Sequence, residues 1–213
     1  MTFSRRSFLL GLAGAGIGLP ALSGRAGAVA APEMQMVPIE LFQDAQELGS
    51  TVRLGHPHGD VIIMEFFDYN CPWCKRSAAD LPALLKAEPD LSYILVNFAI
   101  LGQASVEATK VALGFRQLMG PEKYLPLHLA LFGLKGSVNG ERALEQAVLL
   151  GADKDKLVEA ANSEAVLDQM KATLKIGNAL GFNVTPSYIL GNEAYSGGLT
   201  LAEKRAIIAR TRG

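Results

Sequence analysis

The sequence holds only two cysteines, Cys71 and Cys74, separated by Pro72 and Trp73. They lie in the segment MEFFDYNCPWCKRSAADLP, residues 64–82, after an apolar run and before a pattern that predicts a helix. A Cys-x-x-Cys pair can supply half of a zinc site, a structural disulfide or a redox-active dithiol. The surrounding residues favour one of these three chemistries.

A pair of cysteines at the start of a helix favours redox chemistry. The reactive form of cysteine is the thiolate, and the unpaired N–H groups at a helix N-terminus carry a partial positive charge that stabilises it. We expect Cys71 at that terminus, with the N–H groups of Trp73 and Cys74 directed towards its sulfur. Pro72 suits the first helical turn, where its missing N–H costs nothing. Cys74, one turn further in, is then placed to close the disulfide.

The two other chemistries are disfavoured. A structural zinc site needs four ligands, and the remaining candidates, His56 and His58, precede the strand that the cysteines follow. A strand of about six to eight residues spans roughly 20–27 Å, so the two pairs would lie at its opposite ends. A disulfide across two residues closes almost no loop and stabilises little. A protein that binds Cu(I) or Zn(II) through the same cysteines remains the alternative from another functional class.

The segments around the cysteines predict a βαβ unit. VIIMEFFDY, residues 61–69, is a continuous apolar run typical of a buried strand. From Cys71 onwards the apolar residues recur with helical spacing, and Pro82 is expected to kink this helix or divide it in two. LSYILVNFAIL, residues 91–101, predicts a second strand, and the strand–helix–strand order predicts parallel pairing.

A helical region and a final ββα segment follow. Residues 103–181 hold helix-like segments punctuated by glycines, with no strand pattern. TPSYILGN and EAYSGG then predict a hairpin, and a last helix follows Thr200, a candidate N-cap. Residues 31–55 are interpreted as an N-terminal arm that contains a short helix. The order of elements over residues 56–213 predicts an α/β, thioredoxin-like fold with an inserted helical domain.

The first thirty residues predict an export signal rather than part of the fold. Arg5 and Arg6 precede an uncharged run rich in Leu, Gly and Ala, and residues 28–30 form an A-x-A cleavage site. The SRRSFLL core is similar to a twin-arginine export motif, and a general secretory signal is the alternative. Removal of residues 1–30 changes the formal charge from −1 to −4. The periplasm, an oxidising compartment, is the expected location, and nucleic acid is not expected as a partner because no basic run is present.

Several segments together are similar to the DsbA family of periplasmic thiol–disulfide oxidoreductases: EFFDYNCPWCKR, ILGQASVEATKVAL, TPSYILGN and the inserted helices. The resemblance covers about residues 55–210. It implies that Cys71 is the exposed nucleophile, that Cys74 is the resolving thiol, and that the Thr185–Pro186 bond is cis and packs against the disulfide. The backbone of Thr185 would then pair with an extended substrate. The residues alone leave an ordinary trans turn open, because few X–Pro bonds are cis.

Two further residues bear on the chemistry. A carboxylate inside a buried strand is costly unless it is paired or functional, and Glu65 lies in such a strand, six residues before Cys71. The resemblance implies an acid beneath the active site at that position, so we expect Glu65 to carry protons to and from Cys74. The alternative is an outward-facing residue on an imperfect strand. Trp73 departs from the histidine of the best-known family members, which leaves the oxidising strength open.

The sequence therefore predicts an enzyme that exchanges thiols and disulfides through Cys71 and Cys74. Its expected form is an oxidase that introduces disulfide bonds into exported proteins with free thiols. A disulfide isomerase or reductase of the same fold is the nearest alternative. The resemblance implies that no cofactor is needed and that a membrane partner of the DsbB kind, linked to quinone, reoxidises the pair.

Overall fold

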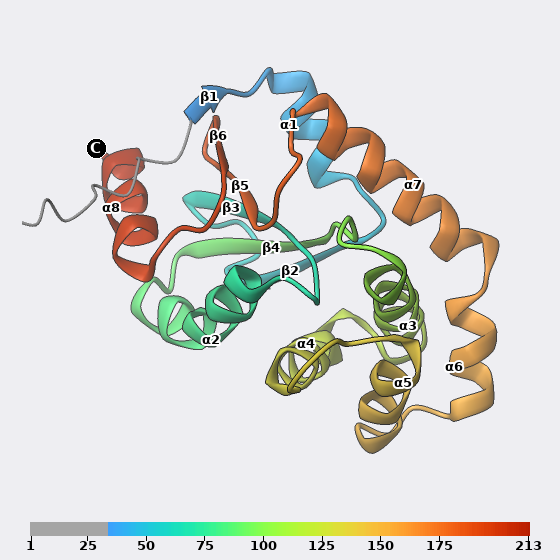
Figure 1. Ribbon diagram of the computed structural model, residues 1–213. Helices are drawn as coiled ribbons and strands as arrows, with labels where there is room; N and C mark the ends of the chain where they lie inside the picture. The colour runs from blue at the N-terminus through green and yellow to red at the C-terminus, as the bar shows by residue number, and fades with distance from the viewer. Residues whose placement is uncertain (1–33) are drawn as a thin grey trace, which may run out of the picture. The chain divides into compact units, whose positions relative to one another are not determined.

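The computed structural model describes residues 34–213, and the predicted export signal lies outside these residues (Figure 1). The described chain forms a six-stranded sheet with the strand order β1-β6-β5-β3-β4-β2. β3 and β4 are parallel, and the other neighbouring strands are antiparallel. The strands are β1 (Met34–Met36), β2 (Thr51–Gly55), β3 (Val61–Phe67), β4 (Leu91–Asn97), β5 (Ser187–Leu190) and β6 (Glu193–Ser196).

Helices cover both faces of the sheet and extend beside it (Figure 1). α2 and α8 pack on one face, α1 and α7 pack on the other, and α3 to α6 form the helical region that lies beside the sheet. The helices are α1 (Ile39–Gln46), α2 (Pro72–Ala87), α3 (Gln103–Met119), α4 (Tyr124–Gly133), α5 (Gly140–Leu149), α6 (Lys154–Ala161), α7 (Glu164–Ala179) and α8 (Leu201–Arg212), with the short 3-10 helix η1 (Pro121–Lys123) before α4.

β3 is buried on both faces, which explains its unbroken apolar sequence. Successive side chains of a strand point to opposite faces. Ile63 and Phe67 accordingly join the core cluster that contains α2 and α8 residues, whereas Met64 and Phe66 join the cluster on the opposite face. Glu65 has the same parity as Ile63 and Phe67, so this carboxylate points towards α2 and α8.

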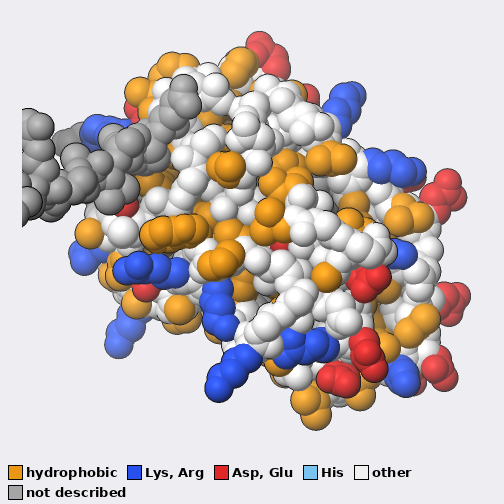
Figure 2. Space-filling model, in the orientation of Figure 1, with side chains coloured by type: hydrophobic (Ala, Val, Ile, Leu, Met, Phe, Trp, Pro, Cys, Tyr) orange, Lys and Arg blue, Asp and Glu red, His pale blue; other side chains and the backbone are white. Residues whose placement is uncertain are grey.

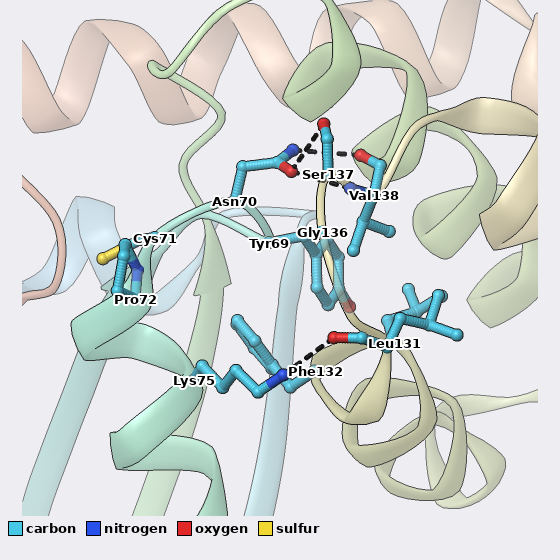
Figure 3. A pocket seen from close by; sticks show the side chains of 11 residues that line it. Tyr69, Asn70, Cys71, Pro72, Lys75, Leu131, Phe132, Gly136, Ser137 and Val138 are labelled. Carbon is cyan, nitrogen blue, oxygen red and sulfur yellow. Dashed lines mark hydrogen bonds between the residues drawn. The ribbon is translucent and has the colours of Figure 1, made fainter.

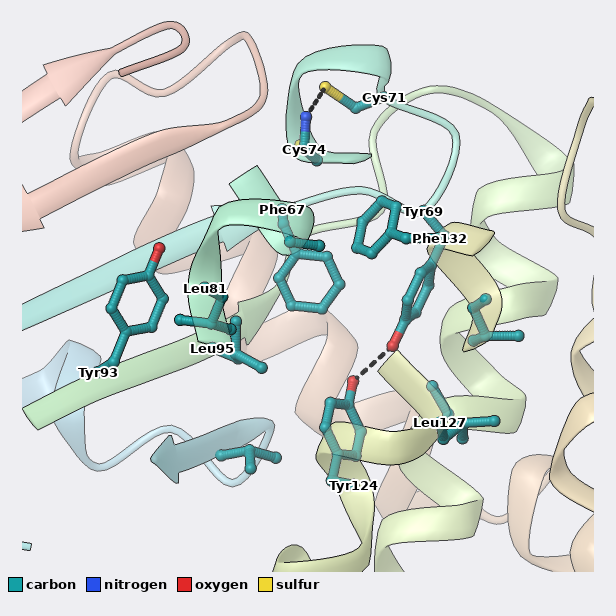
Figure 4. Packing of buried hydrophobic residues seen from close by; sticks show 14 of the residues in the cluster. Phe67, Tyr69, Cys71, Cys74, Leu81, Tyr93, Leu95, Tyr124, Leu127 and Phe132 are labelled. Carbon is teal, nitrogen blue, oxygen red and sulfur yellow. Dashed lines mark hydrogen bonds between the residues drawn. The ribbon is translucent and has the colours of Figure 1, made fainter. Parts of the chain in front are cut away.

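An aromatic cluster fastens the end of β3 to the helical region (Figure 4). The rings of Phe67 and Tyr69 pack against Phe132 and His128 of α4, with centroid distances of 4.7 to 5.9 Å. The hydroxyl groups of Tyr69 and Tyr124 lie 3.0 Å apart. Burial lowers the pKa of His128 to about 3, so this imidazole is neutral and packs as an aromatic ring.

The predicted βαβ unit, the helical segments between 103 and 181, the hairpin and the last helix are all confirmed. Thr200 caps α8, and its hydroxyl accepts a hydrogen bond from the N–H of Glu203. Of the two effects expected of Pro82, a kink or a division of the helix, the division is wrong, because α2 runs unbroken from Pro72 to Ala87. Pro82 faces solvent, where its ring displaces no core side chain.

Two strands were not predicted, and both come from the segment interpreted as an arm. β2 pairs with β4 along one edge of the sheet, and β1 pairs with β6 along the other. β1 has three residues, all exposed, and β2 buries only one side chain fully, so neither carries a clear apolar pattern. The expected short helix is present as α1. Within residues 34–213, no helix is both long and apolar enough to cross a membrane.

Candidate active site

Cys71 is the N-cap residue of α2, and Pro72 occupies the first helical position. The backbone of Cys71 is extended, with φ −89° and ψ 120°, which turns its side chain back over the first turn. The N–H of Cys74 donates a hydrogen bond of 3.2 Å to the Cys71 sulfur (Figure 4). Both cysteines are free thiols, and the Cys71 thiol donates to the carbonyl oxygen of Thr185 at 3.0 Å.

The two thiols have opposite acidities. The pKa of Cys71 falls to about 6, chiefly because its sulfur receives a hydrogen bond from the Cys74 side chain. The backbone N–H groups of Trp73 and Cys74 lower this pKa further, whereas burial of the sulfur opposes the shift. The pKa of Cys74 rises well above its ordinary value, first because the thiol is buried and then because Cys71 and Glu65 are close. Near neutral pH, Cys71 is therefore mainly the thiolate and Cys74 the thiol.

The accessibility of Cys71 differs from the expectation of an exposed nucleophile. Only 4% of Cys71 is exposed, compared with 1% of Cys74. The sulfur of Cys71 is enclosed by the first turn of α2 on one side and by the Thr185 carbonyl on the other. Little of the sulfur is therefore accessible to a substrate thiol in this conformation.

The Thr185–Pro186 bond is cis and lies directly before β5. The carbonyl of Thr185 faces Cys71, and the carbonyl of Pro186 accepts a 3.0 Å hydrogen bond from the N–H of Gly197. The hydroxyl of Thr185 is buried and makes no hydrogen bond within residues 34–213. The structure thus brings together Cys71, Cys74 and the Thr185–Pro186 loop from segments more than a hundred residues apart in the sequence.

Trp73 forms an apolar surface beside the cysteines. It is 55% exposed, and its ring lies flat against Gly198, where an added Cβ atom would come within 3.0 Å of the indole. The guanidinium carbon of Arg76 lies 5.9 Å from the centre of the same ring. A side chain at position 198 would therefore crowd the indole, and the glycine allows Trp73 to lie close to the turn that follows β6.

Glu65 is buried beneath the cysteines, with 3% of its surface exposed. Its carboxylate accepts hydrogen bonds from the hydroxyl groups of Ser77, at 2.8 Å, and of Tyr93. The hydroxyl of Tyr188 lies 3.5 Å from the second carboxylate oxygen. The alternative of an outward-facing side chain is thus wrong. Glu65 also lies close enough to Cys74 for its charge to raise the pKa of that thiol.

Lys204 of α8 completes this buried cluster, and the sequence analysis missed it. Only 2% of Lys204 is exposed, and its ammonium group donates to the hydroxyl groups of Ser77, at 2.6 Å, and Tyr93, at 3.2 Å. The ammonium also lies 4.7 Å from the centre of the Tyr188 ring. Burial lowers the pKa of Lys204, and the nearby charge of Glu65 opposes that effect. The sequence could have indicated that Lys204 is buried, because its spacing places it on the same face of α8 as Leu201, Ile207 and Ile208.

Two polar residues before the cysteines, also missed, fix the active-site loop. The carboxylate of Asp68 accepts hydrogen bonds from the N–H groups of Ile100 and Leu101, both at 2.9 Å, and from Ser105, at 2.7 Å. The N–H of Cys71 donates to the Asp68 carbonyl at 3.1 Å. The loop that carries Cys71 is therefore fixed to the loop between β4 and α3.

Asn70 fixes the same loop to the helical region. Its amide oxygen accepts from the N–H of Val138 at 2.7 Å, and its amide nitrogen donates to the carbonyl of Val138 at 2.9 Å. Ser137 and Ser105 occupy the remaining positions of the amide at 3.0 Å each (Figure 3). All four hydrogen-bonding positions of this side chain are thus used.

The histidines considered as metal ligands lie away from the cysteines. His56 and His58 precede β3, and the ring of His56 accepts a hydrogen bond from the N–H of His58 at 3.1 Å. Within the part of the chain that the structure describes, no three His, Cys, Asp or Glu side chains are grouped to hold a metal ion.

A redox-competent cysteine pair at a helix N-terminus, set against a buried carboxylate in a mixed sheet, defines a thiol–disulfide oxidoreductase of the thioredoxin-like fold. The chain belongs to the thioredoxin family, whose sequence pattern matches residues 47–210. No curated protein matches the chain.

Solved structures agree with this assignment. A thioredoxin-like oxidoreductase from Silicibacter pomeroyi is 32% identical, covers 80% of this chain and 97% of its own, and has a TM-score of 0.73. The thiol–disulfide exchange protein α-DsbA2 from Wolbachia pipientis is 26% identical over 80% of this chain and 91% of its own, also with a TM-score of 0.73. The catalytic domain of Proteus mirabilis ScsC shares the fold at 22% identity, over 81% of this chain and 94% of its own, with a TM-score of 0.73.

Proposed function

We propose that this thiol–disulfide oxidoreductase acts as an oxidase that introduces disulfide bonds into exported proteins. The observation that carries the proposal is the lowered pKa of Cys71, to about 6. A group that stabilises the Cys71 thiolate stabilises the reduced enzyme, and a stable reduced form makes the oxidised form a better oxidant. The similarity to α-DsbA2, a thiol–disulfide exchange protein, supports the same chemistry.

The reaction starts from the Cys71–Cys74 disulfide. A substrate thiolate attacks the sulfur of Cys71, the bond between the two cysteines breaks, and Cys74 leaves with the electron pair. Because the pKa of Cys74 is raised, this leaving thiolate takes up a proton, and the buried carboxylate of Glu65, whose charge acts on Cys74, is the group proposed to relay it. A second substrate thiolate then attacks the substrate sulfur of the mixed disulfide. Cys71 leaves as a thiolate, the substrate is oxidised and the enzyme is reduced.

The backbone around Thr185 is the proposed docking edge for the substrate. Within residues 34–213, its carbonyl oxygen accepts a hydrogen bond from the protonated Cys71 thiol, and this donor is absent when Cys71 is a thiolate or forms a mixed disulfide. An extended substrate segment beside Cys71 can then donate a backbone N–H to this carbonyl, as an added strand does. Pro186 cannot donate a backbone hydrogen bond of its own, so the edge presents an acceptor.

Two cysteine variants test the assignment of roles. Cys71→Ser is expected to abolish exchange, whereas Cys74→Ser is expected to accumulate mixed disulfides with substrate proteins, since no internal thiol can release them. Non-reducing electrophoresis after acid quenching counts these adducts. Adducts with the Cys71 variant and none with the Cys74 variant would contradict the assignment.

The equilibrium constant of the pair with glutathione separates an oxidase from a reductase. A constant that leaves the enzyme reduced in a glutathione buffer poised near the potential of the endoplasmic reticulum, about −180 to −210 mV, indicates an oxidase. A constant that leaves it oxidised there indicates a reductase. Rearrangement of a scrambled disulfide protein by the reduced enzyme would favour the isomerase instead.

We further propose that the protein works in the periplasm, reached by the twin-arginine route, and that a DsbB-like membrane protein reoxidises it. The twin arginine at residues 5 and 6 and the A-x-A at residues 28–30 support the export signal. A similar structure from Salmonella enterica is described as periplasmic. Changing Arg5 and Arg6 to Lys is expected to retain the protein in the cytoplasm, as cell fractionation measures. Unchanged export would leave only the general secretory route.

A further inference from the structure

Positively charged side chains border the part of the surface where Cys71 lies. Lys75 is the only charged residue that lines the groove beside Cys71, between the start of α2 and the segment after α4 (Figure 3). Arg76, the next residue of α2, is exposed. Lys135 lies in the segment on the other side of this groove and is exposed, and Arg142 of α5 is half-buried behind it. We call these four cations the basic rim: Lys75, Arg76, Lys135 and Arg142.

The contacts of the basic rim hold its charges in place without neutralising them. The ammonium of Lys75 donates to the carbonyl of Leu134 at 2.7 Å, and the guanidinium of Arg142 donates to the carbonyl of Ser137. The guanidinium carbon of Arg76 lies 5.9 Å from the centre of the indole ring beside it. Within residues 34–213, no carboxylate oxygen lies within 4.0 Å of a side-chain nitrogen of the rim.

The carboxylates on the surrounding elements face other parts of the molecule. Asp68 of the active-site loop is fully buried, and backbone N–H groups donate to it. Asp80 of α2 is half-buried, and its charge acts on the buried lysine of α8. Glu141 and Glu145 of α5 line a separate groove on the side of α6. Glu203 accepts hydrogen bonds from the N-cap residue of α8. The opening beside the reactive sulfur is therefore bordered by positive charge.

The basic rim is opposite in sign to the protein as a whole. Without residues 1–30 the chain has a formal charge of −4. Figure 2 shows Lys and Arg side chains over α2 and beside α4, whereas most Asp and Glu side chains on that face lie over the more distant helices. An acidic partner is thus attracted at the rim and repelled by the molecule's net charge. Such an uneven distribution of charge orients a charged partner as it approaches.

We propose that the basic rim steers acidic thiol proteins towards Cys71. The partner is a polypeptide with Asp and Glu residues in the segment that carries its reactive cysteine. The inference rests on the proposed function, because it names the class of substrate that this reaction favours. It concerns the rate of association, which complementary charge raises by long-range attraction. The charge of the substrate, and not a fitted contact, is what the rim selects.

Ionic strength distinguishes steering from a short-range contact. The Debye length is about 30 Å at 0.01 M salt and about 8 Å at 0.15 M, so the rim attracts a distant partner mainly at low salt. The attraction increases the population of the encounter complex, so it raises the second-order rate constant even where the exchange step is slow. Between these two salt concentrations we expect the rate constant with an acidic peptide to fall about tenfold, within the range of electrostatic steering. The rate constant with a basic peptide is expected to rise.

The experiment measures how fast single-cysteine peptides consume the oxidised mature protein, by acid quenching and mass spectrometry. The peptides have one length and carry four Asp, four Ser or four Lys residues at the same positions, away from the cysteine. Each rate constant is divided by that of the same peptide with hydroxyethyl disulfide, a small neutral disulfide, which corrects for differences in thiol reactivity. The neutral thiol 2-mercaptoethanol measures the intrinsic reactivity of the disulfide in each protein variant.

Charge reversals in the rim and away from it then locate the effect. Arg76→Glu with Lys135→Glu is expected to bring the Asp-to-Ser ratio at 0.01 M salt to about one, because the rim then has two charges of each sign. Lys86→Glu with Lys175→Glu is the control, because it makes the same change in net charge at exposed lysines, at the other end of α2 and on α7 across the sheet. The control pair is expected to keep most of the wild-type ratio. Circular dichroism checks folding, and the Gln variants at positions 76 and 135, with an expected intermediate ratio, carry the test if the Glu variants do not fold.

Several results would decide against the proposal. Equal rate constants for the Asp and Lys peptides at 0.01 M salt, with normal reduction by 2-mercaptoethanol, would overturn steering and leave the proposed function intact. An equal loss in the rim pair and the control pair would assign the effect to net charge alone. Equal peptide rates together with rim-dependent binding to phosphatidylglycerol vesicles would assign the rim to a membrane surface. A wild-type protein that reacts neither with 2-mercaptoethanol nor with any peptide would overturn the proposed function and the steering with it.

Discussion

The sulfur of Cys71 is stabilised as a thiolate by groups that belong to its own helix. The N–H of Cys74 points at the sulfur because Cys71 is the N-cap of α2, and the N–H of Trp73 contributes in the same way. Burial of the sulfur raises its pKa, but the hydrogen bonds lower the pKa by more than burial raises it. The largest contribution is the hydrogen bond from the Cys74 side chain, and the backbone N–H groups add to it, so the pKa of this buried sulfur is lowered without a charged side chain beside it.

The pH dependence of the reduction potential tests this thiolate. Above the Cys71 pKa of about 6, reduction of the disulfide takes up one proton, and below it two. For a two-electron couple each proton contributes roughly 30 mV per pH unit, so we expect the potential to fall by about 30 mV per unit above pH 6 and by about 60 mV below it. Equilibration with glutathione measures the slope. A slope of about 60 mV that continues to the ordinary thiol pKa of about 8.5 would contradict the lowered pKa.

The lowered pKa of Cys71 also makes the stability of the reduced protein depend on pH. The thiol binds its proton more tightly in the unfolded chain, so the folded reduced protein gains stability as the pH rises from about 6 towards the unfolded pKa. This gain is lost as the pH falls through 6. Urea unfolding of the reduced protein across this range follows the change, and Cys71→Ser is the matched control that should lack it.

Trp73 offers a second test at the residue scale. We expect Trp73→His to make the enzyme a stronger oxidant, since an imidazolium near the Cys71 sulfur adds a positive charge that the indole lacks. A lowering of the thiol pKa by about one unit corresponds to roughly 1.4 kcal/mol and about 30 mV. Ultraviolet absorbance of the thiolate across pH gives the pKa. If neither quantity moves, the N-terminus of α2 and the Thr185–Pro186 loop set the potential instead.

Among the elements, α8 has a part in the site that its position at the end of the chain does not suggest. It places Lys204 against the hydroxyl groups of Ser77 from α2 and Tyr93 from β4, and both hydroxyl groups donate in turn to Glu65 of β3. The cation and the carboxylate are thus joined through two shared hydroxyl groups. Each of the two charges compensates for the burial of the other.

A double-mutant cycle tests this coupling. Lys204→Met is expected to destabilise the reduced protein by about 3 kcal/mol, because it leaves the Glu65 carboxylate buried without its cation. Glu65→Gln with Lys204→Met is expected to cost less than the sum of the single changes. Urea denaturation measures the free energy of unfolding, and Lys171→Met, at an exposed lysine, is the control. Additive losses would show that the two side chains act independently.

Glu65 also has an expected kinetic effect. If Glu65 carries the proton of Cys74, Glu65→Gln should slow the closure of the Cys71–Cys74 disulfide by about a hundredfold, the usual contribution of a general base. Stopped-flow reoxidation of the reduced enzyme by oxidised glutathione follows this closure. A rate equal to that of the wild type at every pH would assign Glu65 to stability alone.

Across the whole described chain, Asn70 is the main polar link between the active-site loop and the helical region. Asn70→Ala removes four hydrogen bonds and leaves the N–H and carbonyl of Val138 unpaired. We expect a loss of about 2 to 4 kcal/mol in the free energy of unfolding and faster hydrogen exchange at Val138. Asn162→Ala, at an exposed asparagine, is the control and should change stability by about 0.5 kcal/mol or less. Equal effects of the two changes would contradict the role of Asn70.

The sequence by itself determined the elements and the reactive pair. The apolar run of β3, the helical spacing of α2 and the N-cap at Thr200 are features of neighbouring residues, so a short window contains them. The same holds for Cys71 and Pro72, whose places at the start of a helix follow from residue type. The division expected at Pro82 did not occur, because this residue lies on the exposed face of a helix whose other face packs on the sheet.

Only the tertiary structure decided which distant residues meet. Lys204 and Ser77 are 127 positions apart, and Asn70 and Val138 are 68 apart, so no local pattern couples them. β1 and β2 became strands because the exposed edges of β6 and β4 offered backbone hydrogen bonds, not because their own sequences required it. The groove beside Cys71 likewise exists only where α2 and the segment after α4 come together. Local propensity acts within a few residues, whereas burial and hydrogen bonding are satisfied by whatever the fold brings near.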